Sequence, residues 1–298
     1  MRCADIGILG FGKMPADCLR VLLGRNLRPD FVCETQESPF SPLRRLCEER
    51  GIHYRKSLRA ETTGFLEGLR GRTVLLSINN NYLFPEQVVR RDGLRIVNFH
   101  NALLPSYPGH GLIIPCWVLF NGETRHGVTW HLVDTGIDTG PVLCSDIFDV
   151  SSSDTAFSLM RRGVEHGVSL FERHWESFLD FDTPGVAPDD SGQGVYRHPL
   201  RHRLHKRADL PGGGVLDPAW DFEECFRFLR SLDYSPFPLL PSPRIVIGGQ
   251  ARIIEKYRIE EGGRSAVSGL GGRGLDEHPL NFNQGTIVLF LRPEPEHA

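Results

Sequence analysis

Two short polar segments carry the residue types from which a catalytic site can be built. In the first, Asn98 and His100 end a β-rich apolar run, and a proline-rich segment, 105–110, follows them. Side chains on a strand alternate with a period of two, so we expect both to point to one face. A carboxamide donates hydrogen bonds to a negatively charged oxygen, and an imidazole exchanges protons near neutral pH. The pair therefore predicts group-transfer or hydrolytic chemistry.

The second segment, 126–141, runs from a predicted strand into a turn in which glycines alternate with two acids, Asp134 and Asp138. Glycines allow the tight backbone that holds a carboxylate in a fixed place. We expect Asp138 to face His100. Taken singly, each of these polar residues is more often a turn former or a satisfied hydrogen-bonding group, but their combination favours a catalytic centre.

The elements that must position these residues indicate a doubly wound α/β fold with a mostly parallel sheet. β-rich runs alternate with amphipathic segments, as in a sheet flanked by helices. We predict strands over 6–10, 31–34, 73–78, 94–100, 127–133 and 142–150. Helices are predicted after residue 12, near 42–50, 62–69 and 85–90, and along an apolar stripe over 156–178 that Ser153 and Asp154 would cap. Ligand crevices in such sheets lie at the carboxyl ends of strands, where Asn98 and His100 are expected.

A dinucleotide-binding motif is only partly present. Gly10-Phe11-Gly12 resembles the start of the G-x-G-x-x-G fingerprint, but Pro15 stands at the third glycine position. Asp30 or Glu34 would supply the acidic residue that such a site needs further along the chain. The simpler interpretation is that the two glycines allow a tight turn from strand to helix.

Composition argues against several classes of protein. The 298 residues carry 34 Lys and Arg against 37 Asp and Glu, a net charge of −3, so no positive excess attracts the chain to nucleic acid. Apolar runs such as 287–291 are far shorter than the ~20 residues that cross a bilayer, and the first residues lack the apolar region of a signal peptide. We expect a cytoplasmic protein with no membrane or nucleic-acid partner.

Neither the 7 cysteines nor the 12 histidines have the spacing of a metal site. The cysteines are odd in number and never form a Cys-x-x-Cys pair, which is typical of reduced thiols in the cytosol. His126 and His131 are five positions apart on a predicted strand and should point to opposite faces. We expect no metal.

The composition changes after residue 181. Residues 182–193 are rich in Pro, Gly, Asp and Ser, as in a linker, and a basic run up to Arg207 follows, which suits either a solvated face or a contact to phosphate or substrate. We predict a catalytic domain over 1–185, a basic linker over 186–207 and a small β-rich, reduced OB-like domain over 208–298. The last part is expected to contain a helix over 222–232, a hairpin turning at Gly248 and Gly249, and a surface loop over the glycine-rich 262–274.

The two motifs together resemble a known signature. The chain is similar to 10-formyltetrahydrofolate-dependent formyltransferases in Asn98-x-His100, Leu103-Leu104-Pro105, Gly109 and, forty residues after Asn98, Asp138-x-Gly140. The likeness covers residues 1–180 and implies a Rossmann-like fold, 10-formyltetrahydrofolate as co-substrate and no metal. It also implies a catalytic triad in which Asn98 stabilises the oxyanion, His100 moves the proton and Asp138 orients His100.

The same resemblance implies where the co-substrate binds. By similarity to the formyltransferase of the aminoarabinose pathway, one segment would line the pterin pocket, mainly through backbone groups: Asn81, Tyr82 and Leu83. A loop would form the other wall: Asp134, Thr135, Gly136 and Ile137. His110 stands where that enzyme has an arginine and is a further candidate contact. Tyr82 and Leu83 fit plain core residues equally well.

The acceptor does not follow from these motifs. The C-terminal part, in 217–220 and 230–238, resembles the reduced C-terminal region of formyltransferase units of nonribosomal peptide and siderophore assembly. Residues 197–298 hold 14 Lys and Arg against 13 Asp and Glu, unlike the basic tRNA-contacting region of methionyl-tRNA formyltransferases. We expect a small-molecule primary amine, free or carrier-bound, on an amino-acid or peptide-like natural-product intermediate. A nucleotide-linked amino sugar is the alternative, ahead of methionyl-tRNA and of hydrolysis by water, and the sequence carries no signal of oligomeric state.

Overall fold

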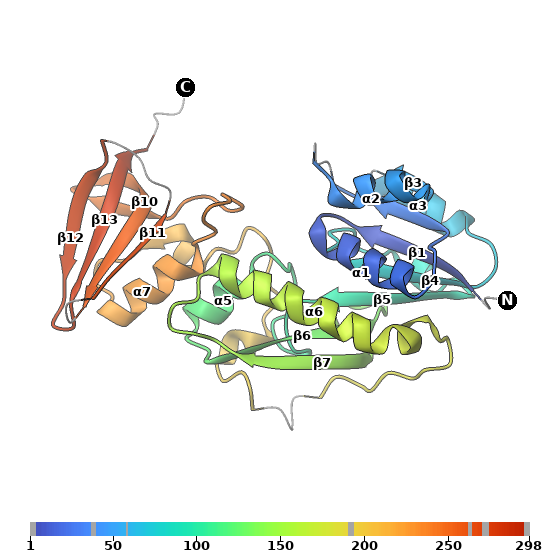
Figure 1. Cartoon of the computed structure of the whole chain (residues 1–298). Coiled ribbons are helices and arrows are strands. Elements are labelled where there is room, and N and C mark those ends of the chain that lie inside the picture. The colour runs from blue at the N-terminus through green and yellow to red at the C-terminus, as the bar shows by residue number, and fades with distance from the viewer. Residues whose placement is uncertain are drawn as a thin grey trace.

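The computed structural model describes residues 4–36, 40–57, 59–189, 194–261, 264–269 and 274–294, which fold into two sheets (Figure 1). The first has the strand order β3-β2-β1-β4-β5-β6-β7, and the second has the order β12-β13-β10-β9-β8 with β11 paired to β10. Figure 1 shows the second sheet at one end of the molecule, far from β1, β2 and β3. The mostly parallel first sheet and the additional second sheet confirm the predicted fold class.

The strands of the first sheet change direction at β6. They are β1 (Asp5–Gly10), β2 (Phe31–Glu34), β3 (Tyr54–Lys56), β4 (Thr73–Ile78), β5 (Leu94–His100), β6 (Arg125–Leu132) and β7 (Val142–Asp149). The first five are parallel, whereas β6 is antiparallel to β5 and β7 is antiparallel to β6. The end of β5, where Asn98 and His100 lie, is therefore flanked by one parallel and one antiparallel strand.

Helices cover both faces of this sheet and bury it on both sides. One face packs on α1 (Lys13–Gly24), α2 (Pro42–Arg50) and α6 (Ala156–Leu179), and the other on α3 (Arg59–Gly68) and α4 (Glu86–Val89). The long α6 begins after Thr155, whose hydroxyl accepts from the Ser158 backbone N–H, so the cap predicted at Ser153 and Asp154 lies one residue later. Gly163 and Gly167 let α6 approach β5 closely, because an added Cβ would lie 2.2 Å from Asn101 and 2.3 Å from Phe99.

The turn from β1 to α1 explains the incomplete dinucleotide motif. A Cβ on Gly10 would lie 1.9 Å from the Ile78 carbonyl oxygen, and Gly12 has a φ of 84°. The two acids that a dinucleotide site would need make structural hydrogen bonds instead: Glu34 accepts from the hydroxyls of Ser41 and Tyr54, and Asp30 accepts from the Ile6 backbone N–H. These contacts favour the tight-turn interpretation of the glycines.

The C-terminal part is built on α7 and the second sheet. Its elements are α7 (Phe222–Ser231), β8 (Val215–Leu216), β9 (Arg244–Ile247), β10 (Gln250–Glu261), β11 (Arg264–Gly269), β12 (Asp276–Asn281) and β13 (Thr286–Pro293). β9 and β10 form the predicted hairpin, with positive φ at Gly248 and Gly249. The expectation of a loop over 262–274 was wrong for 264–269, which pair with β10 as β11; residues 262–263 and 270–273 lie outside the described part of the chain.

A continuous core joins the two parts of the molecule. The short α5 (Ile114–Phe120) packs against α7, and Trp117, Phe228 and Leu289 belong to one cluster of buried side chains. Part of the predicted basic linker also contributes, because Val195 and Tyr196 are buried in this cluster. We call residues 195–207 the strap; it includes the 3₁₀ turn Pro199–His202, and a second such turn, Pro211–Gly214, follows it. No helix in the described ranges is long and apolar enough to cross a membrane.

Candidate active site

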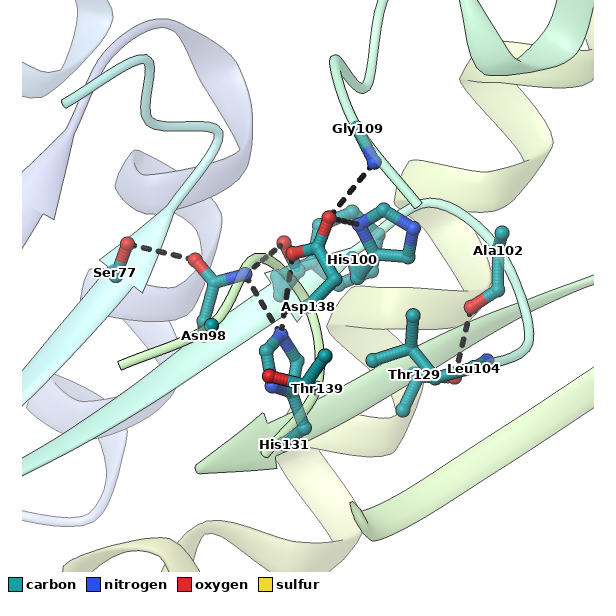
Figure 2. Close-up of polar contacts among 12 residues, drawn as sticks. Ser77, Asn98, His100, Ala102, Leu104, Gly109, Thr129, His131, Asp138 and Thr139 are labelled. Carbon is teal, nitrogen blue, oxygen red and sulfur yellow. Dashed lines mark hydrogen bonds and ion pairs between the residues drawn. The ribbon is translucent and has the colours of Figure 1, made fainter. Parts of the chain in front are cut away.

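The register of three neighbouring strands places the first group of polar side chains. Ser77 on β4 pairs with Asn98 on β5, and Asn98 pairs in turn with His131 on β6. Residues at the same register point to the same face, so the three side chains lie in a row across the sheet, with Asn98 in the middle (Figure 2). Both neighbours hydrogen-bond the carboxamide.

These bonds fix which way the Asn98 amide points. The Ser77 hydroxyl donates to Asn98 Oδ1 at 2.7 Å, and Asn98 Nδ2 donates to His131 Nε2 at 3.0 Å and to the Phe99 carbonyl at 3.2 Å. Asn80, just after β4, donates from Nδ2 to the Ser77 hydroxyl at 3.2 Å and accepts from the Tyr82 backbone N–H at 2.9 Å. The Asn98 amide is thereby linked to the segment that the sequence predicts as a co-substrate wall.

His131 belongs to the same hydrogen-bond network, although the sequence analysis did not assign it to the site. Its Nδ1 donates to the Leu132 carbonyl at 2.9 Å, so Nε2 of the neutral ring carries the lone pair that accepts from Asn98. The ring is 2% exposed, and burial lowers the pKa of His131 to about 4, with His100 acting in the same direction. A neutral His131 therefore orients Asn98. The sequence shows that His131 lies in the same polar segment as Asp138. It does not show that His131 pairs with Asn98 across β5 and β6.

His100 and Asp138 form the second half of the site. His100, 4% exposed, donates from Nε2 to the Tyr107 carbonyl at 2.9 Å, which leaves Nδ1 facing Asp138 Oδ2 at 3.5 Å. Asp138 has a φ of 55°, and its Oδ2 also accepts from the Gly109 backbone N–H at 2.8 Å. Asp138 Oδ1 lies 3.8 Å from His131 Nε2, so the carboxylate stands between the two imidazoles (Figure 2). The structure thus brings Asn98, His100 and Asp138 together.

The loop that carries Asp138 is shaped by its own side chains. Asp134 Oδ1 accepts from the Gly136 backbone N–H at 3.1 Å and from the Thr139 hydroxyl at 2.6 Å. A Cβ on Gly140 would lie 1.9 Å from the Leu132 carbonyl oxygen, which requires glycine where the loop returns to the sheet. Thr135, Gly136 and Ile137 are exposed at its tip.

The predicted co-substrate residues differ in what they can offer a ligand. Asn81–Leu83 follow β4 and Asp134–Ile137 follow β6, so the two segments come from the two neighbours of β5. Leu83 and Ile137 are 56% and 43% exposed, as expected for apolar walls that a ligand would cover. The Tyr82 side chain instead lies in the core, with its hydroxyl 2.7 Å from that of Thr63, so only its backbone is available.

His110 follows Gly109, the residue whose backbone N–H contacts Asp138. Its Nδ1 accepts from the Leu112 backbone N–H at 3.3 Å, and its own backbone N–H donates to the His205 carbonyl at 2.8 Å. Burial and the neighbouring Arg207 lower the pKa of His110. His110 therefore stands beside the strap. Within the described residues, no group of three or more His, Cys, Asp or Glu side chains is arranged to hold a metal ion.

Comparison with known proteins agrees with this geometry. Residues 31–174 match the family described as formyl transferase. This part of the chain is similar to formyltransferases. The predicted resemblance is confirmed, and formyl transfer is the activity that the matched family and the relatives share.

The relatives of this chain differ in acceptor. It is 28% identical to GDP-perosamine N-formyltransferase of Brucella melitensis over 78% of this chain and 85% of that protein. It is 26% identical to methionyl-tRNA formyltransferase of Myxococcus xanthus over 85% of this chain and 76% of that protein. A solved N-formyltransferase from Helicobacter canadensis, in complex with folinic acid and dTDP-3-aminofucose, has the same fold, with a TM-score of 0.69 and 17% identity over 96% of this chain and 98% of that chain.

Proposed function

We propose that this formyltransferase moves the formyl group of 10-formyltetrahydrofolate to the amine of a nucleotide-linked amino sugar. The observation that carries the acceptor is the strap, whose exposed basic side chains lie beside the loop that holds His100 and Asp138. The likeness to GDP-perosamine N-formyltransferase supports the same acceptor class. This reverses the order of the two acceptors expected from the sequence, where an amino-acid or peptide-like amine came first.

The reaction defines what the site must do. When an amine adds to a formyl carbonyl, negative charge develops on the oxygen, and the proton that the amine loses must reach the leaving nitrogen. Asn98 Nδ2 would donate to that oxygen in place of its 3.2 Å bond to the Phe99 carbonyl, and losing one such donor costs ~10²–10³ in rate. His100 exchanges the proton at Nδ1, because Nε2 is engaged by the Tyr107 carbonyl. Asp138, at 3.5 Å, stabilises the protonated imidazole.

The co-substrate fits the two segments beside β5. The exposed apolar side chains of Leu83 and Ile137 would cover its rings, and the backbone of 81–83 would supply the hydrogen bonds that a pterin needs. Asn80 holds this backbone by bonds to the N–H and the carbonyl of Tyr82. The same Asn80 contacts Ser77, so co-substrate binding and the orientation of Asn98 share one hydrogen-bond network.

The strap suits an acceptor that carries phosphates. Its residue 205 forms a backbone bridge with Gly109, next to the Asp138 contact. Three side chains that flank this bridge are exposed and cationic: Arg203, Lys206 and Arg207. Asp209 lies 3.7 Å from Arg203 and offsets part of this charge, so the net field is positive but modest. A nucleoside diphosphate would be attracted here, and the attraction would weaken with salt.

The test is an acceptor panel followed by mass spectrometry. The full chain is incubated with 10-formyltetrahydrofolate and with GDP- and dTDP-linked amino sugars, ornithine or amino-acid amines, and each product is examined for one added formyl group. We expect formylated amino sugars, and a loss of ~10² or more in rate for Asn98→Ala, His100→Ala and Asp138→Ala. Neutralising Arg203, Lys206 and Arg207 to Gln should raise KM for the nucleotide sugar by about tenfold, with less effect at high salt.

The control carries the same change of charge elsewhere. Arg45, Arg50 and Arg90 are exposed and lie on or beside α2 and α4, and their replacement by Gln should leave KM unchanged. Product from amino-acid amines alone would overturn the acceptor and leave formyl transfer intact. Near-normal rates in all three triad variants would overturn the catalytic assignment itself.

A further inference from the structure

One loop supplies backbone groups to both members of the His100–Asp138 pair. Tyr107 gives the carbonyl that accepts from His100 Nε2, and Gly109 gives the N–H that donates to Asp138 Oδ2. Tyr107 has a φ of 51°, a left-handed conformation that a bulky residue adopts only when its surroundings hold it there. The position of this loop therefore decides where the two catalytic side chains sit.

The strap and Glu123 hold Tyr107 in place. The Tyr107 ring packs edge-on against Tyr196 at 4.8 Å and stacks on His205 at 5.4 Å between ring centroids. Its backbone N–H donates to the Arg201 carbonyl, and its hydroxyl donates to Glu123 Oε1 at 3.1 Å. The loop is thus fixed from the side opposite to His100 by a segment roughly ninety residues further along the chain.

Glu123 joins the loop to the strap. Its carboxylate, just after α5, is 5% exposed and accepts from the Tyr107 hydroxyl and from the backbone N–H groups of Arg197 and His198 at 2.9–3.1 Å. A buried carboxylate costs free energy unless donors surround it, and here the donors come from the two segments that must be aligned. An apolar side chain would fill the space without fixing either segment.

We propose that Glu123 is a positioning residue for His100, acting through the strap and Tyr107. The proposal rests on the role given to His100 under the proposed function, but not on the identity of the acceptor. The Tyr107 carbonyl holds the proton on Nε2 and stabilises the protonated ring, so that proton exchange takes place at Nδ1, which faces Asp138. The other ionisable groups that face His100 are His131, at 6.4 Å between ring centroids, and His126 along β6.

The test replaces Glu123 by Gln in the full chain. The amide keeps the volume of the side chain but loses the charge and one acceptor. At least one of the hydrogen bonds from Tyr107, Arg197 and His198 should then be lost, and the strap should no longer hold Tyr107 in a fixed position. NMR of ¹⁵N-labelled histidine should then show His100 as a mixture of the two tautomers, because the bond from Nε2 to the Tyr107 carbonyl weakens. We expect kcat to fall by about tenfold, with KM for the co-substrate unchanged.

Two further variants separate positioning from stability. Glu34→Gln changes another glutamate, 1% exposed and bonded to the Ser41 and Tyr54 hydroxyls, and should destabilise the fold without moving the His100 signals. Tyr107→Phe removes only the hydroxyl, and its effect on kcat should be less than additive with Glu123→Gln if the two residues act together.

The NMR signals test this proposal even if none of the amines in the panel is formylated. An unchanged His100 tautomer in Glu123→Gln, or full additivity in the double variant, would overturn it. The same shift in Glu34→Gln would overturn it too, because the effect would then follow from stability alone.

Discussion

At the scale of single residues, the site depends on how one carboxamide is held. Asn98 lies between a hydroxyl donor and a neutral imidazole acceptor, so its Nδ2 and Oδ1 cannot exchange places without losing both bonds. The low pKa of His131, about 4, keeps this acceptor neutral across the physiological range. The Asn98 carboxamide is therefore oriented by these contacts before any ligand binds.

Ser77→Ala tests this orientation. The change removes the donor to Asn98 Oδ1 and the acceptor of Asn80, and we expect kcat to fall by about tenfold with little change in KM for the acceptor. Ser41→Ala is the matched control, because Ser41 is also buried and hydrogen-bonded but caps α2. It should cost about 1 kcal/mol of stability and leave kcat unchanged. Equal kinetics in the two variants would show that Ser77 does not orient Asn98.

At the scale of elements, the active site is shared between the first sheet and the strap. β5 supplies Asn98 and His100, the loop after β6 supplies Asp138, and the strap fixes the loop 105–110 between them. Gly109 is the point of closest approach, with a φ of 126° and a distance of 2.1 Å from an added Cβ to the His205 carbonyl oxygen. The strap can lie there only because position 109 has no side chain.

Gly109→Ala should separate the strap from the loop. We expect a lower melting temperature and a loss of about 10² in kcat, because both His100 and Asp138 lose their backbone partners. Gly111→Ala, two residues further, is the control: an added Cβ there meets nothing within 4 Å, so both properties should stay near those of the parent protein. Thermal unfolding and steady-state kinetics measure the two effects. A fully active Gly109→Ala variant would contradict this account of the strap.

At the scale of the whole molecule, one core runs from α5 through the strap to the second sheet. Trp117, Tyr196 and Leu289 belong to the same buried cluster, so the C-terminal part stabilises the helix and loops next to the active site. Three buried histidines lie in or near the first sheet and the strap. Burial lowers their pKa values to about 3 for His126 and about 4 for His131 and His205.

These histidines predict a loss of stability in mild acid. Between pH 6.5 and about 4 the unfolded chain binds their protons and the folded chain does not, so the free energy of unfolding falls as pH decreases, by about 1.4 kcal/mol per pH unit for each proton. His205→Phe should reduce this slope by the contribution of one proton, about 1.4 kcal/mol per pH unit. Chemical unfolding measured from pH 7.5 to 4.5 gives the slope. An identical slope in His205→Phe and the parent would contradict the prediction for that residue.

Local sequence pattern determined the elements that carry the chemistry. The runs at 31–34, 73–78 and 94–100 form strands with the predicted limits, because parallel strands buried on both faces read as continuous apolar segments bounded by turn residues. The period of a strand placed Asn98 and His100 on one face, and the glycines around Asp138 indicated a tight loop. These features depend on neighbours in the chain, and they were enough to recognise the formyltransferase family.

Only the tertiary structure decided the partners of these residues. The antiparallel direction of β6 and its register, which bring His131 to Asn98, depend on packing between strands that no local pattern encodes. The strap reads as a solvated basic linker, yet its buried side chains and backbone carbonyls hold the loop 105–110 from the far side of the site. Tyr82 likewise turns its side chain into the core, where it packs with Leu66 and its hydroxyl meets that of Thr63 on α3. No local pattern around Tyr82 encodes this contact with another element. Contacts between distant segments depend on how the elements pack, so the residue types and spacing of the candidate site could be recognised locally, whereas the orientation of its side chains could not.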